Sequence, residues 1–288
     1  MLRLTLLFLP FALFAQTGPP RRTKLPATLT EVSGLVLTPD GNLWALNDGG
    51  NSSELFRFDA KTLQLLDTRT LPIPNRDWED LTADKEGNLY IGDFGNNGNN
   101  RKDLRIYRYH PQRGTMDSIL FRYPDQWAFP PKDKRQWNFD CEAMVFFGDS
   151  LHLFSKNRFK SNHFSKHYVL PAQAGVHVPM LRDSVYLKKR VVSGASMGED
   201  GKTLSLTAYY IGFFLKCIPY TRAQAYFFTN YDGARFFSAA RRRKKLPKCL
   251  IARQFESIAA WRPGVWLVAN EGIGPQKAAL WRLKVNDK

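Results

Sequence analysis

Acidic residues recur at one place in a repeated sequence pattern, and they are the residues best suited to chemistry. Glu31, Glu79, Glu142 and Glu256 each stand at the start of a short apolar stretch. Carboxylates that are brought close together cannot all stay ionised unless something neutralises them. A hard divalent cation such as Ca²⁺ would do so, because it binds carboxylate oxygens. Ion pairs with Lys or Arg are a second interpretation, and catalysis by the carboxylates is a third.

A second polar set follows the next apolar stretch of each unit, at Asp48, Asp93, Lys156 and Glu271. Its oxygens could complete a cation site, although Asp and Asn also serve to satisfy turn backbones. Lys156 stands alone among acids, where it could form a salt bridge or meet the charge of a substrate. We therefore predict Glu142 and Lys156 as catalytic residues, and as metal ligands Glu31, Glu79, Glu142, Glu256, Asp48, Asp93 and Glu271.

The elements that must position these residues are paired strands that recur along the whole chain. Each unit has a short apolar strand, a tight Gly-containing turn and a second strand that alternates apolar and polar residues. The units start at residues 31, 79, 142, 194 and 256, which gives intervals of 48, 63, 52 and 62 residues. Such spacing predicts an all-β fold, a β-propeller with one unit per blade, in which the like-placed acids surround a central channel. A two-sheet β-sandwich is the competing fold.

The blade count follows from the longer intervals. Residues 225–237 contain aromatic stretches around Asp232-Gly233 and could form a further degenerate blade, so we expect six blades with five clear repeats. Closure of the ring requires a strand near residues 27–30 to join the last blade near residues 278–285. The domain boundaries then predict a signal peptide over residues 1–15, a linker over 16–26 and the propeller over 27–288.

The N-terminus indicates export. Leu4 to Ala15 is an almost unbroken apolar run after Arg3, too short to span a bilayer and typical of a signal peptide. We therefore expect a soluble exported protein, periplasmic or secreted, and a monomer. The three cysteines leave two interpretations open: Cys217 pairs with Cys249, leaving Cys141 free, or all three are free thiols.

The chain is strongly basic, with 42 Lys and Arg against 26 Asp and Glu and a formal net charge of +16. Such a balance favours acidic partners without indicating a fold. One run is especially basic and is a candidate for binding an anionic small molecule, an acidic glycan or a protein partner, with nucleic acid disfavoured; a solvated outer strand is the other interpretation. The run consists of Arg241, Arg242, Arg243, Lys244 and Lys245.

Several motifs occur in an order that resembles a known group of proteins. They include Asp77-Trp78-Glu79-Asp80-Leu81, residues 90–97 with Arg101, Asp140-Cys141-Glu142-Ala143-Met144 and Gln254-Phe255-Glu256-Ser257-Ile258. Together they resemble secreted bacterial propellers of the phytase-like and esterase-like group. The resemblance implies a six-bladed, calcium-dependent protein. It leaves two functional hypotheses, a metal-dependent hydrolase of an anionic or ester substrate and a non-catalytic binding propeller for an acidic glycan or a protein.

Overall fold

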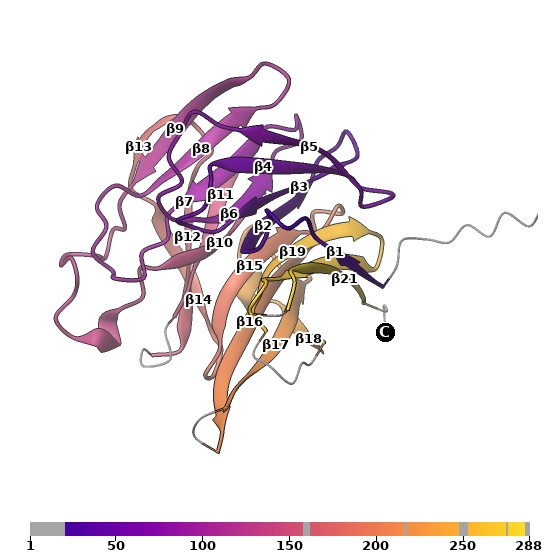
Figure 1. Ribbon diagram of the computed structural model, residues 1–288. Helices are drawn as coiled ribbons and strands as arrows, with labels where there is room; N and C mark the ends of the chain where they lie inside the picture. The colour runs from indigo at the N-terminus through magenta and orange to yellow at the C-terminus, as the bar shows by residue number, and fades with distance from the viewer. Residues whose placement is uncertain (1–20, 158–161, 216–217, 248–252, 275, 286–288) are drawn as a thin grey trace, which may run out of the picture.

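The computed structural model shows an all-β protein built from five sheets that are arranged as the blades of a propeller (Figure 1). It describes residues 21–157, 162–215, 218–247, 253–274 and 276–285. Buried apolar side chains form five clusters, and each cluster fills the space between two neighbouring blades. The predicted all-β propeller is therefore confirmed, and the stacked sheets of a sandwich are not observed in the described part of the chain.

The strands follow one another from the centre of each blade to its outer edge. Blade 1 consists of β2 (Val32–Leu37), β3 (Asn42–Asn47), β4 (Glu54–Asp59) and β5 (Leu65–Thr70). Blade 2 consists of β6 (Trp78–Ala83), β7 (Leu89–Asp93), β8 (Arg105–His110), β9 (Thr115–Phe121) and, parallel to β9, β13 (Gly175–His177). Blade 3 consists of β10 (Cys141–Phe147), β11 (Ser150–Ser155), β12 (Phe164–Pro171) and β14 (Met180–Tyr186).

The last two blades are joined through the N-terminus. Blade 4 consists of β15 (Val191–Met197), β16 (Thr203–Phe214), β17 (Ile218–Thr229) and β18 (Ala240–Lys245). Blade 5 consists of β19 (Phe255–Arg262), β20 (Val265–Asn270), β21 (Ala279–Lys284) and β1 (Arg22–Lys24). Two short 3₁₀ helices, η1 (Lys134–Gln136) and η2 (Phe236–Ser238), lie in the connections.

Closure of the ring uses the two ends of the described chain, as predicted, but with different residues. Strand β1 pairs antiparallel with β21, with Arg22 opposite Trp281. This strand lies inside residues 16–26, which we assigned to the linker, and it precedes the expected closing segment at 27–30. The predicted signal peptide over residues 1–15 lies outside the described residues.

The prediction of six blades is wrong, because the structure has five. Residues 225–228 belong to β17, the third strand of blade 4, and residues 236–238 form η2. Strands β16 and β17 are twelve residues long each, which accounts for the long interval before the fifth repeat. Phe236 is fully buried in the cluster between blades 3 and 4, so these aromatic residues fill a blade interface.

The five innermost strands, β2, β6, β10, β15 and β19, form a closed ring of neighbours around the axis. Asp80 on β6 is buried and ties this ring together. Its carboxylate accepts hydrogen bonds from the backbone N–H of Leu81 at 2.8 Å and of Met144 on β10 at 2.7 Å, and from the backbone of Ala195 on β15. One side chain thus links three of the five inner strands.

Inner strands approach so closely that small residues are required. A Cβ atom on Gly34 would lie 2.7 Å from the Cβ of Leu81, and one on Gly194 would lie 2.6 Å from the carbonyl oxygen of Glu256. The spacing of the strands therefore leaves no room for larger side chains there. The ring is held tightly enough to fix the residues at its mouth.

Two remaining sequence predictions concern cysteines and membrane spans. Cys141 is a buried free thiol, whereas Cys217 and Cys249 lie outside the described residues, so their pairing stays a prediction. None of the helices in the described ranges is long and apolar enough to cross a bilayer.

Candidate functional site

A β-bulge occurs at the start of every inner strand and determines which side chains reach the mouth of the ring. The strand register skips one residue at each of these points, and such an extra residue re-aims its side chain. Three of the five bulged residues are glutamates, all buried to an exposure of 4% or less. The bulged residues in blade order are Ser33, Glu79, Glu142, Ser193 and Glu256.

The register places Glu31 outside this set. Ser33, not Glu31, occupies the bulge of blade 1, so the sequence repeats were aligned two residues out of register there. Glu31 is exposed, and its carboxylate accepts a hydrogen bond from Asn51 Nδ2 at 2.6 Å. Glu31 therefore stands at the rim rather than in the buried ring of carboxylates.

Asp93 is also one position away from the expected place. In blade 2 Asp93 is opposite Trp78, and at the equivalent place in blade 1 Asn47 is opposite Val32. Asp93 is therefore the structural equivalent of Asn47 and not of Asp48. Its carboxylate accepts the backbone N–H of Asp77 at 3.2 Å and forms an ion pair with Arg101 at 3.0 Å. Asp93 is thus used inside blade 2, where it orders the strand that carries Asp77.

The remaining predicted residues of the second set do meet at the mouth. Asp48, Lys156 and Glu271 each follow the last residue of the second strand of their blade. Gln254 Nε2 donates a hydrogen bond to Glu271 at 2.8 Å, and Gly49 donates its backbone N–H to Asp48. These three side chains come from blades 1, 3 and 5.

Sequence reasoning missed two further carboxylates, Asp77 and Asp140. Each stands two residues before a bulged glutamate, in the spacing Asp-x-Glu. That repeated spacing was the available signal, because alternate residues of an extended segment point to the same side. Tyr209, the residue of blade 4 at the level of Lys156, was missed as well, and it is buried 6.0 Å from Lys156 Nζ as measured to its ring centroid.

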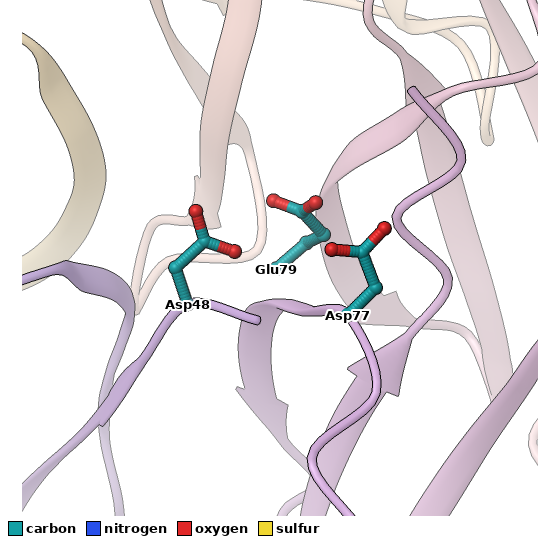
Figure 2. A group of neighbouring side chains, drawn as sticks. All are labelled: Asp48, Asp77 and Glu79. Carbon is teal, nitrogen blue, oxygen red and sulfur yellow. The ribbon is translucent and has the colours of Figure 1, made fainter. Parts of the chain in front are cut away.

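Two overlapping trios of carboxylates have oxygen atoms within 4.8 Å of one another: Asp48, Asp77 and Glu79, and Glu79, Asp140 and Glu142. Figure 2 shows the first trio, in which Asp48 faces Glu79 and Asp77 across a shared space. Among the described residues, none donates a hydrogen bond to the side chain of Asp77 or of Glu79. Buried carboxylates are normally hydrogen-bonded, so these oxygens are available to a ligand.

Glycines close one side of this trio. A Cβ atom on Gly95 would lie 2.1 Å from Glu79 Oε1 and 2.4 Å from Asp77 Oδ2, and one on Gly49 would lie 2.5 Å from Asp77 Oδ1. The backbone can therefore approach the carboxylates only because these positions have no side chain. The trio is held in a cradle formed by the segments around Gly49 and Gly95.

Lys156 provides the cationic centre of the site. Its Nζ atom lies 2.5 Å from Glu142 Oε1, and its backbone N–H donates to the carbonyl oxygen of Asp140 at 2.8 Å. Burial opposes its charge, but the acidic groups around it, Glu142 foremost and then Tyr209, Glu256 and Asp140, together outweigh burial and raise the pKa of Lys156 above its usual range. The same ammonium group lowers the pKa of six carboxyl groups, those of Asp48, Asp77, Glu79, Glu142, Glu256 and Glu271.

One ammonium group does not balance this many carboxylates. Burial raises the pKa of Asp48 to about 7 and that of Glu142 to about 8, and like charges nearby add to both rises. Burial likewise raises the pKa of Glu79, and the negative charge of Glu142 adds to this rise. Burial also raises the pKa of Glu256, where the charge of Glu271 adds to the rise. The site must therefore hold protons or bind a further cation.

The donor set fits a hard divalent cation. It offers carboxylate oxygens from two neighbouring blades, and Glu256 Oε2 is buried without a hydrogen-bond partner among the described residues. Oxygen-rich, partly flexible sets of this kind suit Ca²⁺, which takes six to eight oxygen ligands. The buried acidic cluster could therefore bind a metal ion.

Comparisons with known proteins support the fold. No model of a known protein family and no curated protein matches the chain. Among solved structures, an α-L-arabinanase of Penicillium chrysogenum complexed with arabinobiose has a TM-score of 0.54 at 10% identity and covers 93% of this chain and 98% of its own. A putative gluconolactonase has a TM-score of 0.46 at 10% identity, covering 89% of this chain and 76% of its own.

A virginiamycin B lyase of Staphylococcus aureus has a TM-score of 0.42 at 11% identity, and the match covers 93% of this chain and 88% of the lyase. The arabinanase match supports the β-propeller fold, and at 10% identity it shows no activity. The resemblance to six-bladed propellers is corrected to five blades by the structure. Calcium dependence and export stay predictions.

Proposed function

We propose that the protein is a metal-dependent hydrolase whose reaction takes place at the acidic mouth of the propeller. The observation that carries this proposal is the trio Asp48, Asp77 and Glu79, whose oxygens lie within 4.8 Å of one another beside a buried Lys156–Glu142 pair. Asp77 and Glu79, with Asp48, would hold the cation, which we take to be Ca²⁺. Glu79 also belongs to the trio with Asp140 and Glu142, so it connects the cation site to the Lys156–Glu142 pair.

A bound divalent cation supplies Lewis acidity, which polarises a carbonyl or phosphoryl oxygen and favours deprotonation of water. The residues of the chain supply the proton transfer. Burial raises the pKa of Glu142 to about 8, so its ionised carboxylate is basic enough to accept a proton from water, and the carboxyl group formed in this way can return the proton to a leaving group. The ammonium group of Lys156 stabilises the charged form of Glu142 and would stabilise negative charge that develops on the substrate.

The charge of the mouth favours a neutral ester over an anionic substrate. Six carboxyl groups surround the Lys156 ammonium group, so a free phosphate or carboxylate would meet like charges. A neutral ester avoids this repulsion and acquires negative charge only as water attacks its carbonyl carbon. We therefore expect turnover of carboxylic esters to exceed turnover of phosphate esters.

The proposal is tested with a panel of chromogenic carboxylic esters, phosphate esters and glycosides, assayed with Ca²⁺ and with a chelator. We expect hydrolysis of carboxylic esters that the chelator removes and added Ca²⁺ restores. Glu142→Gln should lower kcat at least about a hundredfold, the usual contribution of a general base, whereas Glu86→Gln, an exposed acid on a distant turn, should leave kcat unchanged. Turnover that survives both the chelator and Glu142→Gln would refute the proposal.

The alternative is a non-catalytic binding propeller, and one observation favours it: the structure carries a cationic groove at the outer strands of blades 4 and 5, lined by none of the residues of the acidic mouth. In that case Ca²⁺ would stabilise the fold, and no member of the substrate panel would be hydrolysed. The same experiment therefore separates the two functions.

A further inference from the structure

In blades 1 and 2, an arginine on the third strand forms an ion pair with an aspartate on the fourth strand. Arg57 on β4 pairs with Asp67 on β5, and Arg108 on β8 pairs with Asp117 on β9 at 2.5 Å. The two arginines are structurally equivalent, because the strand pairing places each of them the same number of residues from the bulge of its inner strand. The outermost strand of these blades thus supplies a carboxylate that matches the charge on its neighbour.

Blades 4 and 5 break this pattern. At the same level, Arg282 on β21 lies beside Arg21, whose carbonyl oxygen accepts the Arg282 N–H at 3.1 Å. In blade 4 the corresponding residue of β18 is Arg242, opposite Phe227. Two neighbouring blades therefore carry arginines where blades 1 and 2 carry aspartates.

The two arginines of blade 5 and the lysines at the end of β18 line one groove of about 520 Å³ between β18 and β21. No carboxylate belongs to its lining, which is completed by apolar side chains such as Leu246 and Leu283. Its five cations form no ion pair with any described carboxylate, and Lys244 Nζ is turned into the groove by its hydrogen bond to the carbonyl oxygen of Lys284. The five cations are Arg21, Lys244, Lys245, Arg282 and Lys284.

The excess charge is concentrated in this part of the chain. Residues 191–288 contain 16 Lys and Arg and 6 Asp and Glu, and thus account for a net charge of 16 − 6 = +10 out of +16. Two of the six acids, Glu256 and Glu271, lie at the acidic mouth. Gathering like charges in a concave surface costs free energy, which an anionic ligand would offset.

The shape and chemistry of the groove favour an extended polyanion without aromatic bases. Lys244 and Lys245 come from β18, and Arg282 and Lys284 come from β21, so both strands that border the groove supply cations. The aromatic side chain in the groove lining, Trp281, has the guanidinium groups of Arg22 and Arg253 at 5.2 and 5.0 Å from its ring centroid, and its Nε1 donates to Asn270 at 2.6 Å. Bases of single-stranded nucleic acid bind by stacking on open aromatic faces, and this ring is already covered.

We propose that the groove between β18 and β21 binds an acidic polysaccharide, whose carboxylate or sulfate groups pair with Lys244, Lys245 and Arg282. Of the other cations on this strand, Arg242 lies on the same face as Lys244, whereas Arg241 and Arg243 lie on the opposite face, where Arg241 donates a hydrogen bond to the carbonyl oxygen of Tyr186 at 3.3 Å. This binding site is separate from the acidic mouth, and it does not depend on the presence of a metal ion there.

The test measures binding of the full chain to heparin, polygalacturonate, single-stranded DNA and neutral dextran by affinity electrophoresis at several salt concentrations. The variant Lys244→Ala/Lys245→Ala/Arg282→Ala should bind heparin and polygalacturonate about tenfold more weakly than the wild type, the effect of removing three exposed charge pairs. The matched control is Lys61→Ala/Arg113→Ala/Lys132→Ala, which removes three exposed cations from other blades and should bind as the wild type does.

Each outcome decides the proposal. Equal weakening of binding in both triple variants would mean that net charge alone attracts polyanions. It would overturn the proposal that the groove is the binding site. Tighter binding of single-stranded DNA than of either acidic polysaccharide would assign the groove to nucleic acid instead. Absence of any binding of the wild type to the two polysaccharides would also refute it.

Discussion

The Nζ atom of Lys156 lies 2.5 Å from Oε1 of Glu142 at the mouth of the propeller, where the Glu142 side chain is buried and the Lys156 side chain is only 15% exposed. Loss of one partner of a buried ion pair leaves an uncompensated charge, which typically costs about 3–5 kcal/mol. In the presence of chelator, Lys156→Met should therefore lower the free energy of unfolding in urea by that amount. Lys156→Met/Glu142→Gln should recover part of the loss, and a single variant that costs less than about 1 kcal/mol would contradict the pairing.

Asp80 should be the acid whose removal most damages the fold. Its carboxylate accepts hydrogen bonds from the backbone of Leu81, Met144 and Ala195. Asp80→Ala would leave these buried N–H groups without an acceptor, at about 1–3 kcal/mol each. We expect a loss of about 3 kcal/mol or more in urea unfolding. Asp67→Ala, which removes a half-exposed carboxylate from an outer strand, is the control and should cost about 1 kcal/mol or less.

Stability should fall as the pH is lowered, because His152 is buried in its neutral form. Burial, and then the neighbouring imidazole of His167, lowers the pKa of His152 to about 3, whereas the unfolded chain takes up this proton near pH 6.5. The contribution of His152 is complete above pH 6.5 and is lost, by about 1.4 kcal/mol per pH unit, as the pH falls toward 3.

The measurement compares unfolding free energies of the wild type and His152→Gln at pH 6.5 and 4.5. We expect the wild type to lose about 2.3 kcal/mol more than the variant between these two pH values, because the unfolded imidazole is already half protonated at pH 6.5. His177→Gln, at the surface of blade 2, serves as the control and should keep the slope of the wild type. Parallel pH profiles for the wild type and His152→Gln would show that the buried imidazole does not contribute.

Gly95→Ala tests the cradle around the carboxylate trio without removing a ligand. The added Cβ would lie 2.1 Å from Glu79 Oε1 and 2.4 Å from Asp77 Oδ2, so the two carboxylates must move apart. We expect Ca²⁺ affinity to fall about tenfold or more, because a distorted ligand geometry weakens binding and a loss of roughly 1.4 kcal/mol in binding free energy lowers affinity tenfold. Thermal unfolding in chelator separates this loss from a general loss of folding. Unchanged affinity would place the cation elsewhere.

The architecture could be predicted from the sequence because turn residues and strand alternation are local signals. Hairpin turns such as Asp40-Gly41 and Asp200-Gly201 and the recurrence of the units were sufficient for the propeller and its closure. The blade count was not, because residues 225–237 carry the same local signals. In the structure they form the end of the third strand of blade 4 and the packing between blades 3 and 4, which depends on contacts far apart in the chain.

Assigning the candidate site required a register that the sequence does not display. A bulge inserts one residue without a distinct sequence signal, so Ser33 rather than Glu31 reached the inner position of blade 1. A shift of one residue turns a strand's side chains to the opposite face, which is why Asp93 lies inside its blade and not beside Asp48. Glu79, Glu142 and Glu256 were found because the pattern and the bulge coincide there.

The most direct test of this account is a calorimetric titration of Ca²⁺ into chelator-treated protein, wild type and Asp77→Asn. The wild type should bind Ca²⁺ at the trio of Asp48, Asp77 and Glu79, with heat that saturates at one ion or more per chain. The variant should lose that binding while it unfolds at a similar temperature in chelator. A wild type that takes up no Ca²⁺, or a variant that binds it equally well, would contradict the metal site at the acidic mouth.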